Sequence, residues 1–268
     1  MRSIMEEPVA QGGEKFEPEG HDVVFDHVAF GYGAGEDGRA GEKVLTDVSF
    51  TAKEGEVTAL VGPSGSGKST VAKLLLRFHD ATKGAIRLNG IDLRDLSQDD
   101  IRGRIAYVPQ KAWLFSGTVA SNLRFGNEDA TEADMLHALE VAQSTFVLDQ
   151  PQGLDTPVAQ GGTNFSGGQR QRLAIARALM KHADLYIFDD SFSALDFKTD
   201  AALRHALQDE TCDAAVLIIA QRISTILHAD QIVVLKDGEI VGLGTHDELM
   251  ETCEVYRAIA ESQMKGGE

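Results

Sequence analysis

A glycine-rich loop in the first third of the chain has the residue types needed to hold a phosphate group. Its sequence fits the pattern G-x-x-x-x-G-K-[ST] in full. The loop consists of Gly62, Pro63, Ser64, Gly65, Ser66, Gly67, Lys68 and Ser69, and Thr70 follows it. Glycines let backbone N–H groups face a phosphate, the lysine adds a positive charge, and the serine hydroxyl can bind Mg²⁺. The sequence therefore predicts a site for the phosphates of a nucleotide.

Two adjacent acids occur much later in the chain, after an apolar run. Asp189 and Asp190 directly follow Leu-Tyr-Ile-Phe, which reads as a buried strand. An acid at the tip of a buried strand beside a phosphate loop can hold Mg²⁺ through water. This pattern is weak alone and becomes specific after a complete phosphate loop. We therefore expect Asp189, together with Ser69, to bind the metal ion.

The elements around these residues have the order that such a site requires. Residues 56–62 form an apolar run into the glycine loop, and residues 69–78 then have the spacing of a helix. Residues 185–190 and 214–220 read as two further buried strands. Because helical segments separate these strands, the sequence predicts a parallel sheet flanked by helices. The mostly helical segment 118–180 reads as a lobe inserted between the first two strands.

Turn and capping signals place the remaining elements. We expect a strand at 22–30, a glycine-rich loop at 31–42, a hairpin turn at Asn89-Gly90, a capped helix from Thr131 to Gln143, a helix at about 166–181 and a hairpin at 231–241 around Asp237-Gly238. Together with the parallel strands, these elements fill most of the chain between residues 22 and 262.

Charge and apolar content limit the partners of this chain. The 268 residues carry a formal net charge of −17, from 25 basic and 42 acidic side chains. A field of this sign repels nucleic acid and anionic membranes, so we expect neither as a direct partner.

The longest apolar run, 214–220, is far shorter than the ~20 residues that a membrane helix needs. Cys212 and Cys253 form no C-x-x-C pair and indicate a reducing, cytosolic compartment.

A second glycine motif points to a family. Residues 164–169 read Asn-Phe-Ser-Gly-Gly-Gln, which resembles the signature sequence of ABC ATPases, usually Leu-Ser-Gly-Gly-Gln. The resemblance extends over residues 22–262. It implies an α/β fold, namely a P-loop NTPase core of the ABC type with an N-terminal antiparallel β region and an inserted α-helical subdomain at about 118–180.

The resemblance also assigns roles to residues outside the phosphate loop. It implies ATP and Mg²⁺ as cofactors, with Tyr32 stacked on adenine, Gln110 sensing the γ-phosphate and Mg²⁺, and Asp196 in a loop that crosses to a partner domain. The signature residues are Ser166, Gly167, Gly168 and Gln169. Ser166 would cap a helix whose N-terminus a phosphate can approach. In this family two such domains pack head to tail, and each ATP lies between one phosphate loop and the other domain's signature.

Three stretches resemble ABC exporters in particular: 2–8, 114–126 and 245–250. The first is similar to a linker after a membrane helix, and the second to the groove that receives a coupling helix from the membrane domain. Trp113 either faces this groove or packs inside the domain. The resemblance implies efflux of a small molecule by a motor at the cytoplasmic face of the membrane, attached to a transmembrane domain absent from this chain. We expect a linker at 1–21, the ATPase domain at 22–262 and a flexible tail at 263–268.

Two positions depart from the family at the catalytic centre. The usual general base, Glu, is replaced by Asp190, and the usual switch histidine is replaced by Gln221. Aspartate is one methylene shorter, and a displacement of about 1 Å can cost on the order of 10²-fold in rate. A neutral amide cannot become cationic as histidine can. We therefore expect weak ATP hydrolysis at this chain's own site, formed by Asp190, Gln221 and Gln110, and an unlike partner domain whose site uses this chain's intact signature.

Other nucleotide-binding classes fit the sequence less well. A soluble, non-transport ABC ATPase of the regulatory or translation type is the main alternative, but such proteins usually carry two sets of these motifs and this chain has one. DNA-repair relatives need coiled-coil insertions or metal-binding cysteines, and small-molecule kinases lack the Ser-Gly-Gly-Gln motif.

Overall fold

The computed structural model describes residues 20–33 and 42–265. Within this part of the chain, ten strands join in one sheet in the order β5-β4-β1-β2-β12-β11-β3-β10-β9-β6, and β7 pairs with β8. The strands are β1 Val23–Tyr32, β2 Glu42–Ala52, β3 Val57–Val61, β4 Lys83–Leu88, β5 Ile91–Asp92, β6 Ile105–Val108, β7 Gly117–Thr118, β8 Pro157–Val158, β9 Leu185–Asp189, β10 Ala215–Ile219, β11 Gln231–Lys236 and β12 Glu239–Gly244. The helices are α1 Lys68–Leu75, α2 Gln98–Arg104, α3 Val119–Arg124, α4 Glu132–Val141, α5 Gly167–Leu179, α6 Phe197–Glu210, α7 His246–Thr252 and α8 Glu254–Lys265.

The centre of the sheet is parallel, as the apolar runs predict. Strands β11, β3, β10, β9 and β6 are parallel neighbours. All five residues of β10 are buried, which is the pattern of a strand covered on both faces. Parallel strands end at the same edge of a sheet, so the segments after these strands converge.

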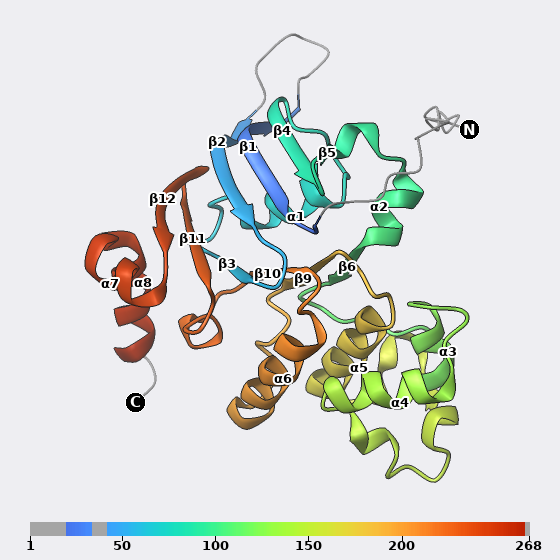
Figure 1. The fold of residues 1–268 in the computed structure, drawn as a ribbon. Helices are drawn as coiled ribbons and strands as arrows, with labels where there is room; N and C mark the ends of the chain where they lie inside the picture. The colour runs from blue at the N-terminus through green and yellow to red at the C-terminus, as the bar shows by residue number, and fades with distance from the viewer. Residues whose placement is uncertain (1–19, 34–41, 266–268) are drawn as a thin grey trace.

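Two separate hydrophobic cores cover the two faces of this parallel region. In β10, Val216 and Ile218 face the core that contains α5, whereas Leu217 and Ile219 face the core that contains α1. Alternate residues of a strand point to opposite faces, so α1 and α5 pack on opposite sides of the sheet. Figure 1 shows the same separation, with α1 above the parallel strands and α3, α4 and α5 in a helical lobe below them.

The antiparallel region predicted near the N-terminus is confirmed. Strand β1 pairs antiparallel with β2 and β4, and β4 pairs with β5 around the predicted Asn89-Gly90 turn. The hairpin of β11 and β12 joins this region to the parallel strands through one pairing, Glu239 with Asp47.

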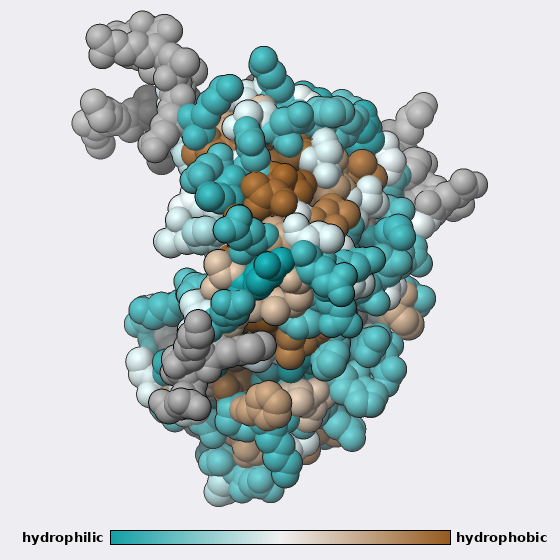
Figure 2. Space-filling view, turned by 90° about the vertical axis from the view of Figure 1, so that its left-hand side faces the viewer, coloured by the Kyte–Doolittle hydropathy of each residue, from teal (hydrophilic) through white to brown (hydrophobic). Residues whose placement is uncertain are grey.

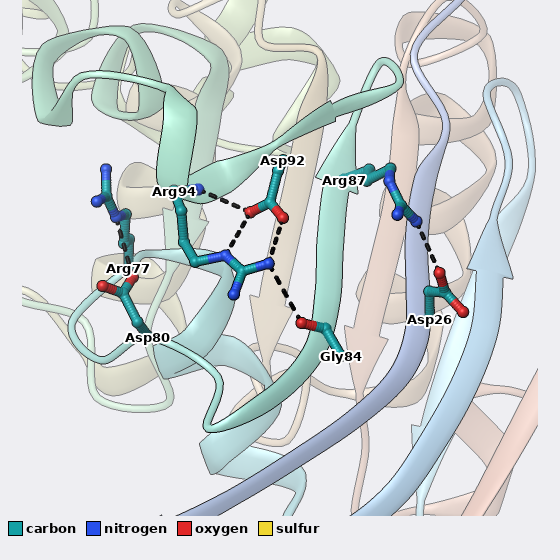
Figure 3. A network of polar contacts seen from close by, with 7 residues as sticks. All are labelled: Asp26, Arg77, Asp80, Gly84, Arg87, Asp92 and Arg94. Carbon is teal, nitrogen blue, oxygen red and sulfur yellow. Dashed lines mark hydrogen bonds and ion pairs between the residues drawn. The ribbon is translucent and has the colours of Figure 1, made fainter.

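Polar side chains link the antiparallel strands, and Arg94 connects the end of β5 to β4 (Figure 3). The Arg94 guanidinium contacts the Asp92 carboxylate and donates to the Gly84 carbonyl oxygen at 3.3 Å. Its hydrogen bond holds the pKa of Asp92 below the ordinary value of 3.8. Arg87 and Asp26 pair across β4 and β1 at 2.9 Å. Exposed pairs of this kind contribute at most about 1 kcal/mol each, so they fix register more than they add stability.

The helical lobe follows the capping signals in the sequence. Helices α3, α4 and α5 begin at Thr118, Thr131 and Ser166, and each of these side chains accepts a hydrogen bond from the backbone N–H three residues later. These caps satisfy N–H groups that have no partner inside the helix. The expected helix at 166–181 is shorter by two residues at its C-terminus, since α5 ends at Leu179.

Other boundaries also differ from the expectations, and the helix expected from Thr131 to Gln143 ends at Val141. The helix expected at 69–78 ends at Leu75, because Arg77 adopts a left-handed backbone with φ of 50°. The loop expected at 31–42 is narrower, since β1 continues to Tyr32 and β2 starts at Glu42. Helix α8 continues to Lys265, past the expected domain end at 262. Nearly all of the linker at 1–21 lies outside the described residues.

The face formed by β12, α7 and α8 is mostly hydrophilic, with hydrophobic patches between the polar side chains (Figure 2). On β12, Val241 and Leu243 are exposed.

Within residues 20–33 and 42–265, none of the helices combines the length and the apolar character needed to span a bilayer.

Candidate nucleotide-binding site

The site residues converge because they follow neighbouring parallel strands. The phosphate loop follows β3, Gln221 follows β10, and Gln110 follows β6. Asp189 is the last residue of β9, and Asp190 follows it. Asp189 is in register with Ile219, and Ile219 with Leu60. Segments that leave parallel strands at one edge are a common place for ligand sites in open α/β sheets. Residues spread over 160 positions of sequence thus share one edge of the sheet.

The phosphate loop wraps around its own lysine. The Lys68 Nζ donates hydrogen bonds to the carbonyl oxygens of Gly62 and Pro63, both at 2.8 Å. Gly67 has a φ of 106°, and a Cβ there would lie 2.6 Å from a methyl carbon of Leu45. The motif glycine at this position is therefore required by both backbone conformation and space. Burial lowers the pKa of Lys68, while Asp189 and Asp190 oppose this shift by their charge.

The oxygen groups of the site fit a magnesium nucleotide. Ser69 is exposed in the first turn of α1, where backbone N–H groups lack partners within the helix. The Ser69 hydroxyl, the Gln110 amide oxygen and the Asp189 carboxylate are hard oxygen ligands, the kind that Mg²⁺ prefers. Asp189 lies close enough to Lys68 for their charges to shift each other's pKa.

Tyr107 is a partner of Asp189 that sequence analysis missed. Its hydroxyl donates to Asp189 Oδ2 at 3.1 Å. Burial raises the pKa of Asp189 above 3.8, and the hydrogen bond from Tyr107 opposes that shift. The pKa of Tyr107 is raised as well, first by burial and then by the charge of Asp189. The pair fixes the direction of the carboxylate, and no pattern in the sequence connected the two residues.

Asp190 and Gln110 are joined directly. Gln110 Nε2 donates to Asp190 Oδ2 at 2.8 Å. The backbone of Asp190 is left-handed, with φ of 48°, and its N–H donates to the Ile219 carbonyl oxygen at 2.7 Å. A non-glycine residue in this region is uncommon and is often found at functional sites. The short carboxylate thus bonds the neighbouring amide, which also makes Gln110 less free to approach a nucleotide.

Gln221 is exposed at the end of β10, and a distant residue holds its backbone. The Gln263 side chain on α8 donates to the Gln221 carbonyl oxygen at 2.6 Å and accepts from the Ile223 N–H at 2.8 Å. Gln263 falls in the segment expected to be a tail, so sequence analysis gave it no role.

Tyr32 lies beside the helix that follows the phosphate loop. Its hydroxyl is 3.4 Å from Thr70 Oγ1, and Lys73 Nζ donates to it at 3.3 Å. The ring packs edge-on against Phe30 and His79 and is 37% exposed. The Lys73 ammonium also lies over the ring, 5.4 Å from its centroid, so the partly exposed ring is held next to α1.

The signature residues stand at the start of α5 in the helical lobe, whereas α1, which follows the phosphate loop, lies on the other side of the parallel strands (Figure 1). Ser166 and Gln169 cap each other, since Gln169 N–H donates to Ser166 Oγ at 3.2 Å and Ser166 N–H donates to Gln169 Oε1 at 2.9 Å. Gly167, between them, is exposed. Asp196 caps α6 by accepting from the Thr199 N–H at 3.0 Å. Both helix N-termini are thus capped, and Ser166 and Asp196 are exposed.

Aromatic side chains gather on the surface of the lobe. Trp113, Phe115 and Phe125 are 50%, 45% and 63% exposed. The rings of Phe115 and Phe125 lie 4.5 Å apart, and the Arg177 guanidinium lies over Phe115. Exposed aromatic clusters of this kind usually mark an interaction surface. Gly161 packs against Trp113, since a Cβ there would lie 3.2 Å from the indole.

Comparison with known proteins places these features in a family. A family model described as ABC transporter matches residues 45–193. An uncharacterised ABC transporter ATP-binding protein of Mycobacterium tuberculosis is 49% identical over 223 residues, which cover 82% of this chain and 38% of that protein. An ATP-dependent lipid A-core flippase of Ralstonia nicotianae is 45% identical over 256 residues, or 94% of this chain and 42% of the flippase.

A solved structure agrees with the sequence relatives. The structure of a bacterial Atm1-family ABC exporter with ATP bound superposes with a TM-score of 0.86 at 35% identity, covering 94% of this chain and 43% of that one. The chain thus spans about two fifths of the length of these relatives. Because the family match includes the phosphate loop, both acids and the signature, the chain belongs to the ABC transporter family and carries its ATP-binding domain.

Proposed function

We propose that this chain is the motor domain of an exporter, which binds Mg-ATP at a head-to-tail interface with a second, non-identical nucleotide-binding domain. The observation that carries the proposal is the packing of α1 and α5 on opposite faces of the sheet. Ser166 begins a helix that packs on the face of the sheet opposite to α1, so it is proposed to meet the phosphate loop of a second chain rather than its own. Two chains in head-to-tail contact would form two sites, each from the phosphate loop of one chain and the signature of the other.

In the proposed complex, the residues at the sheet edge have distinct tasks. The phosphate loop binds the outer phosphates through its N–H groups and Lys68, and Tyr32 stacks on the adenine. Ser69, Gln110 and Asp189 hold Mg²⁺, which neutralises charge that develops on the phosphates. The partner's signature closes the site from the other side and excludes water.

This chain's own site is proposed to hydrolyse ATP slowly. Asp190 has a short carboxylate that already accepts a hydrogen bond from Gln110. Loss of a positioned general base lowers a rate by about 10²–10⁴-fold. Gln221 can donate a hydrogen bond to a γ-phosphate but carries no charge. The signature residues follow the usual pattern except for Phe165, so they are suited to support hydrolysis on the partner's phosphate loop.

The membrane partner is proposed to dock on the lobe through its coupling helices. The exposed ring cluster of Trp113, Phe115 and Phe125 gives this contact an apolar surface. The domain would then lie at the cytoplasmic face of the membrane. Efflux of a small molecule is favoured over a soluble, non-transport role because relatives are named as a flippase and an exporter.

The test is ATP hydrolysis by the reconstituted complex of the full exporter and its partner. Ser166→Ala in this chain should abolish most of the steady-state hydrolysis, because it removes the signature from the working site. Asp190→Asn should lower the rate by less than about twofold, since a site without a well-placed base contributes little turnover. Thr163→Ala, an exposed change near the signature, serves as the matched control.

The decisive comparison is between the Ser166 and Asp190 variants. Equal loss of activity in both would mean that the two sites are not functionally divided. Full activity of the Ser166 variant, with the complex intact, would mean that this signature serves no working site.

A further inference from the structure

The segment that carries Gln110 is held from two directions. From the sheet, the fully buried Ser191 donates through Oγ to the Val108 carbonyl oxygen at 2.8 Å. From the lobe, two side chains of α5 bond carbonyl oxygens on either side of Gln110. Gln171 Nε2 donates to Pro109 at 3.1 Å, and Arg177 Nη2 donates to Trp113 at 3.0 Å. The segment around Gln110 is therefore tied to the signature helix at both ends.

Gln171 is the more informative of the two contacts. Its side chain is only 2% exposed, on a helix whose neighbouring residues 173–176 are buried and apolar. A buried amide is unfavourable unless it finds a hydrogen-bond partner. Its partner is Pro109, 62 positions away in sequence and next to Gln110. The hydrogen bond that satisfies this buried amide therefore holds the backbone next to Gln110.

We propose that Gln171, assisted by Arg177, is a positioning residue that sets the place of the Gln110 side chain relative to Mg²⁺ and the γ-phosphate. The inference rests on the proposed role of Gln110 in the nucleotide site. It adds a physical link between the two half-sites of one chain, because α5 begins at Ser166. A rigid helix that holds both the signature and the Gln110 segment moves them together.

The test measures nucleotide affinity calorimetrically, with Mg-ATP and with ATP in excess EDTA. Gln110→Ala and Gln171→Met should each weaken Mg-ATP binding roughly fivefold, the effect of one net hydrogen bond. ATP without Mg²⁺ should bind both variants as it binds the unchanged chain. If Gln171 acts through Gln110, the double variant should bind Mg-ATP no more weakly than Gln110→Ala alone.

Arg172→Met is the matched control, on the next position of the same helix. Arg172 donates to the Gln143 carbonyl oxygen and lies over the Phe146 ring, which are both outside the Gln110 segment, so its loss should leave the Mg²⁺ dependence unchanged. Amide hydrogen exchange without nucleotide gives a second readout. Exchange at residues 110–113 should become faster in Gln171→Met and stay unchanged in Arg172→Met. Arg177→Met removes the hydrogen bond at the other end of the segment, at Trp113, and serves as a second test. The proposal can therefore be tested even if Gln171→Met fails to fold.

The possible failures are distinguishable. Normal Mg-ATP affinity in Gln110→Ala would remove Gln110 from the proposed site. A weakened Gln110→Ala together with a normal Gln171→Met, or with fully additive effects in the double variant, would overturn the positioning role while leaving the nucleotide site intact.

Discussion

Lys68, which we propose binds the outer phosphates of ATP, is hydrogen-bonded within its own loop. Its ammonium group bonds two carbonyl oxygens of its own loop, so neutral acceptors satisfy this half-buried cation. A phosphate must exchange these neutral acceptors for charged ones. Charged acceptors give shorter and stronger hydrogen bonds to an ammonium, so the exchange favours binding.

Removal of this lysine should weaken nucleotide binding. Hydrogen bonds to charged groups contribute about 1.5–3 kcal/mol, so Lys68→Ala should lower the affinity for Mg-ATP by roughly one to two orders of magnitude. Titration with a fluorescent ATP analogue measures the change. Lys53→Ala, which removes only an exposed pair with Glu56, is the control. Equal affinities of the Lys68 variant and the unchanged chain would refute the assignment of the phosphate loop.

Restoring the usual family residues at positions 190 and 221 should restore ATP turnover. Asp190→Glu with Gln221→His restores a longer base and an ionisable switch residue, and should raise turnover roughly 10²-fold where a dimer forms. The measurement is steady-state ATP hydrolysis, with dimerisation checked by light scattering. Each single change is the control and should have a smaller effect. An unchanged rate in a demonstrated dimer would place the defect outside these two positions.

At the scale of single elements, helix N-termini carry much of the local order. Asp100, Asp134 and Glu248 each accept hydrogen bonds from the capping residue of their own helix. Such reciprocal caps satisfy N–H groups that the helix leaves unpaired. The capping hydrogen bonds hold the pKa of Asp100 and Asp134 below 3.8 and that of Glu248 below 4.5.

These lowered pKa values predict acid lability with a definite sign. A carboxyl whose pKa is lower in the folded state stabilises the fold above its ordinary pKa, and this stabilisation disappears as the pH falls through the folded value. The free energy of unfolding by urea should therefore drop when the pH is lowered from neutral to just below 3.8. Asp134→Asn, which does not titrate, should show a smaller drop. An equal drop in both proteins would exclude Asp134 from the effect.

At the scale of the whole molecule, a different group of elements packs on each face of the sheet. The antiparallel strands and α1 share one core, and the helical lobe shares the other. The net charge of −17 leaves the nucleotide phosphates to be held by local N–H groups and cations rather than by the general field. The lobe shares a core with the sheet, and α5 also contacts β6 and bonds the Gln110 segment directly, so the lobe and the proposed nucleotide site are physically connected.

The sequence by itself determined the features that depend on local pattern. The phosphate loop, the capped start of α5 at Ser166 and the apolar runs of β3, β9 and β10 require only neighbouring residues, because turn geometry, capping and strand burial are set over a few positions. The order of these motifs then predicted the family and its α/β fold. Element ends were less predictable, as the early end of α1 shows, since a single left-handed residue decided it.

Only the tertiary structure decided which distant side chains meet. Gln110 and Asp190 are 80 positions apart, Gln171 and Pro109 are 62 apart, and Gln263 and Gln221 are 42 apart. No local pattern joins these residues, because each contact follows from strand order and from a helix crossing a sheet edge. A hydrogen bond acts over about 3 Å, so small differences in how whole elements pack decide which side chains bond Gln110 and Gln221. Local sequence patterns do not specify that packing, and only the complete fold does.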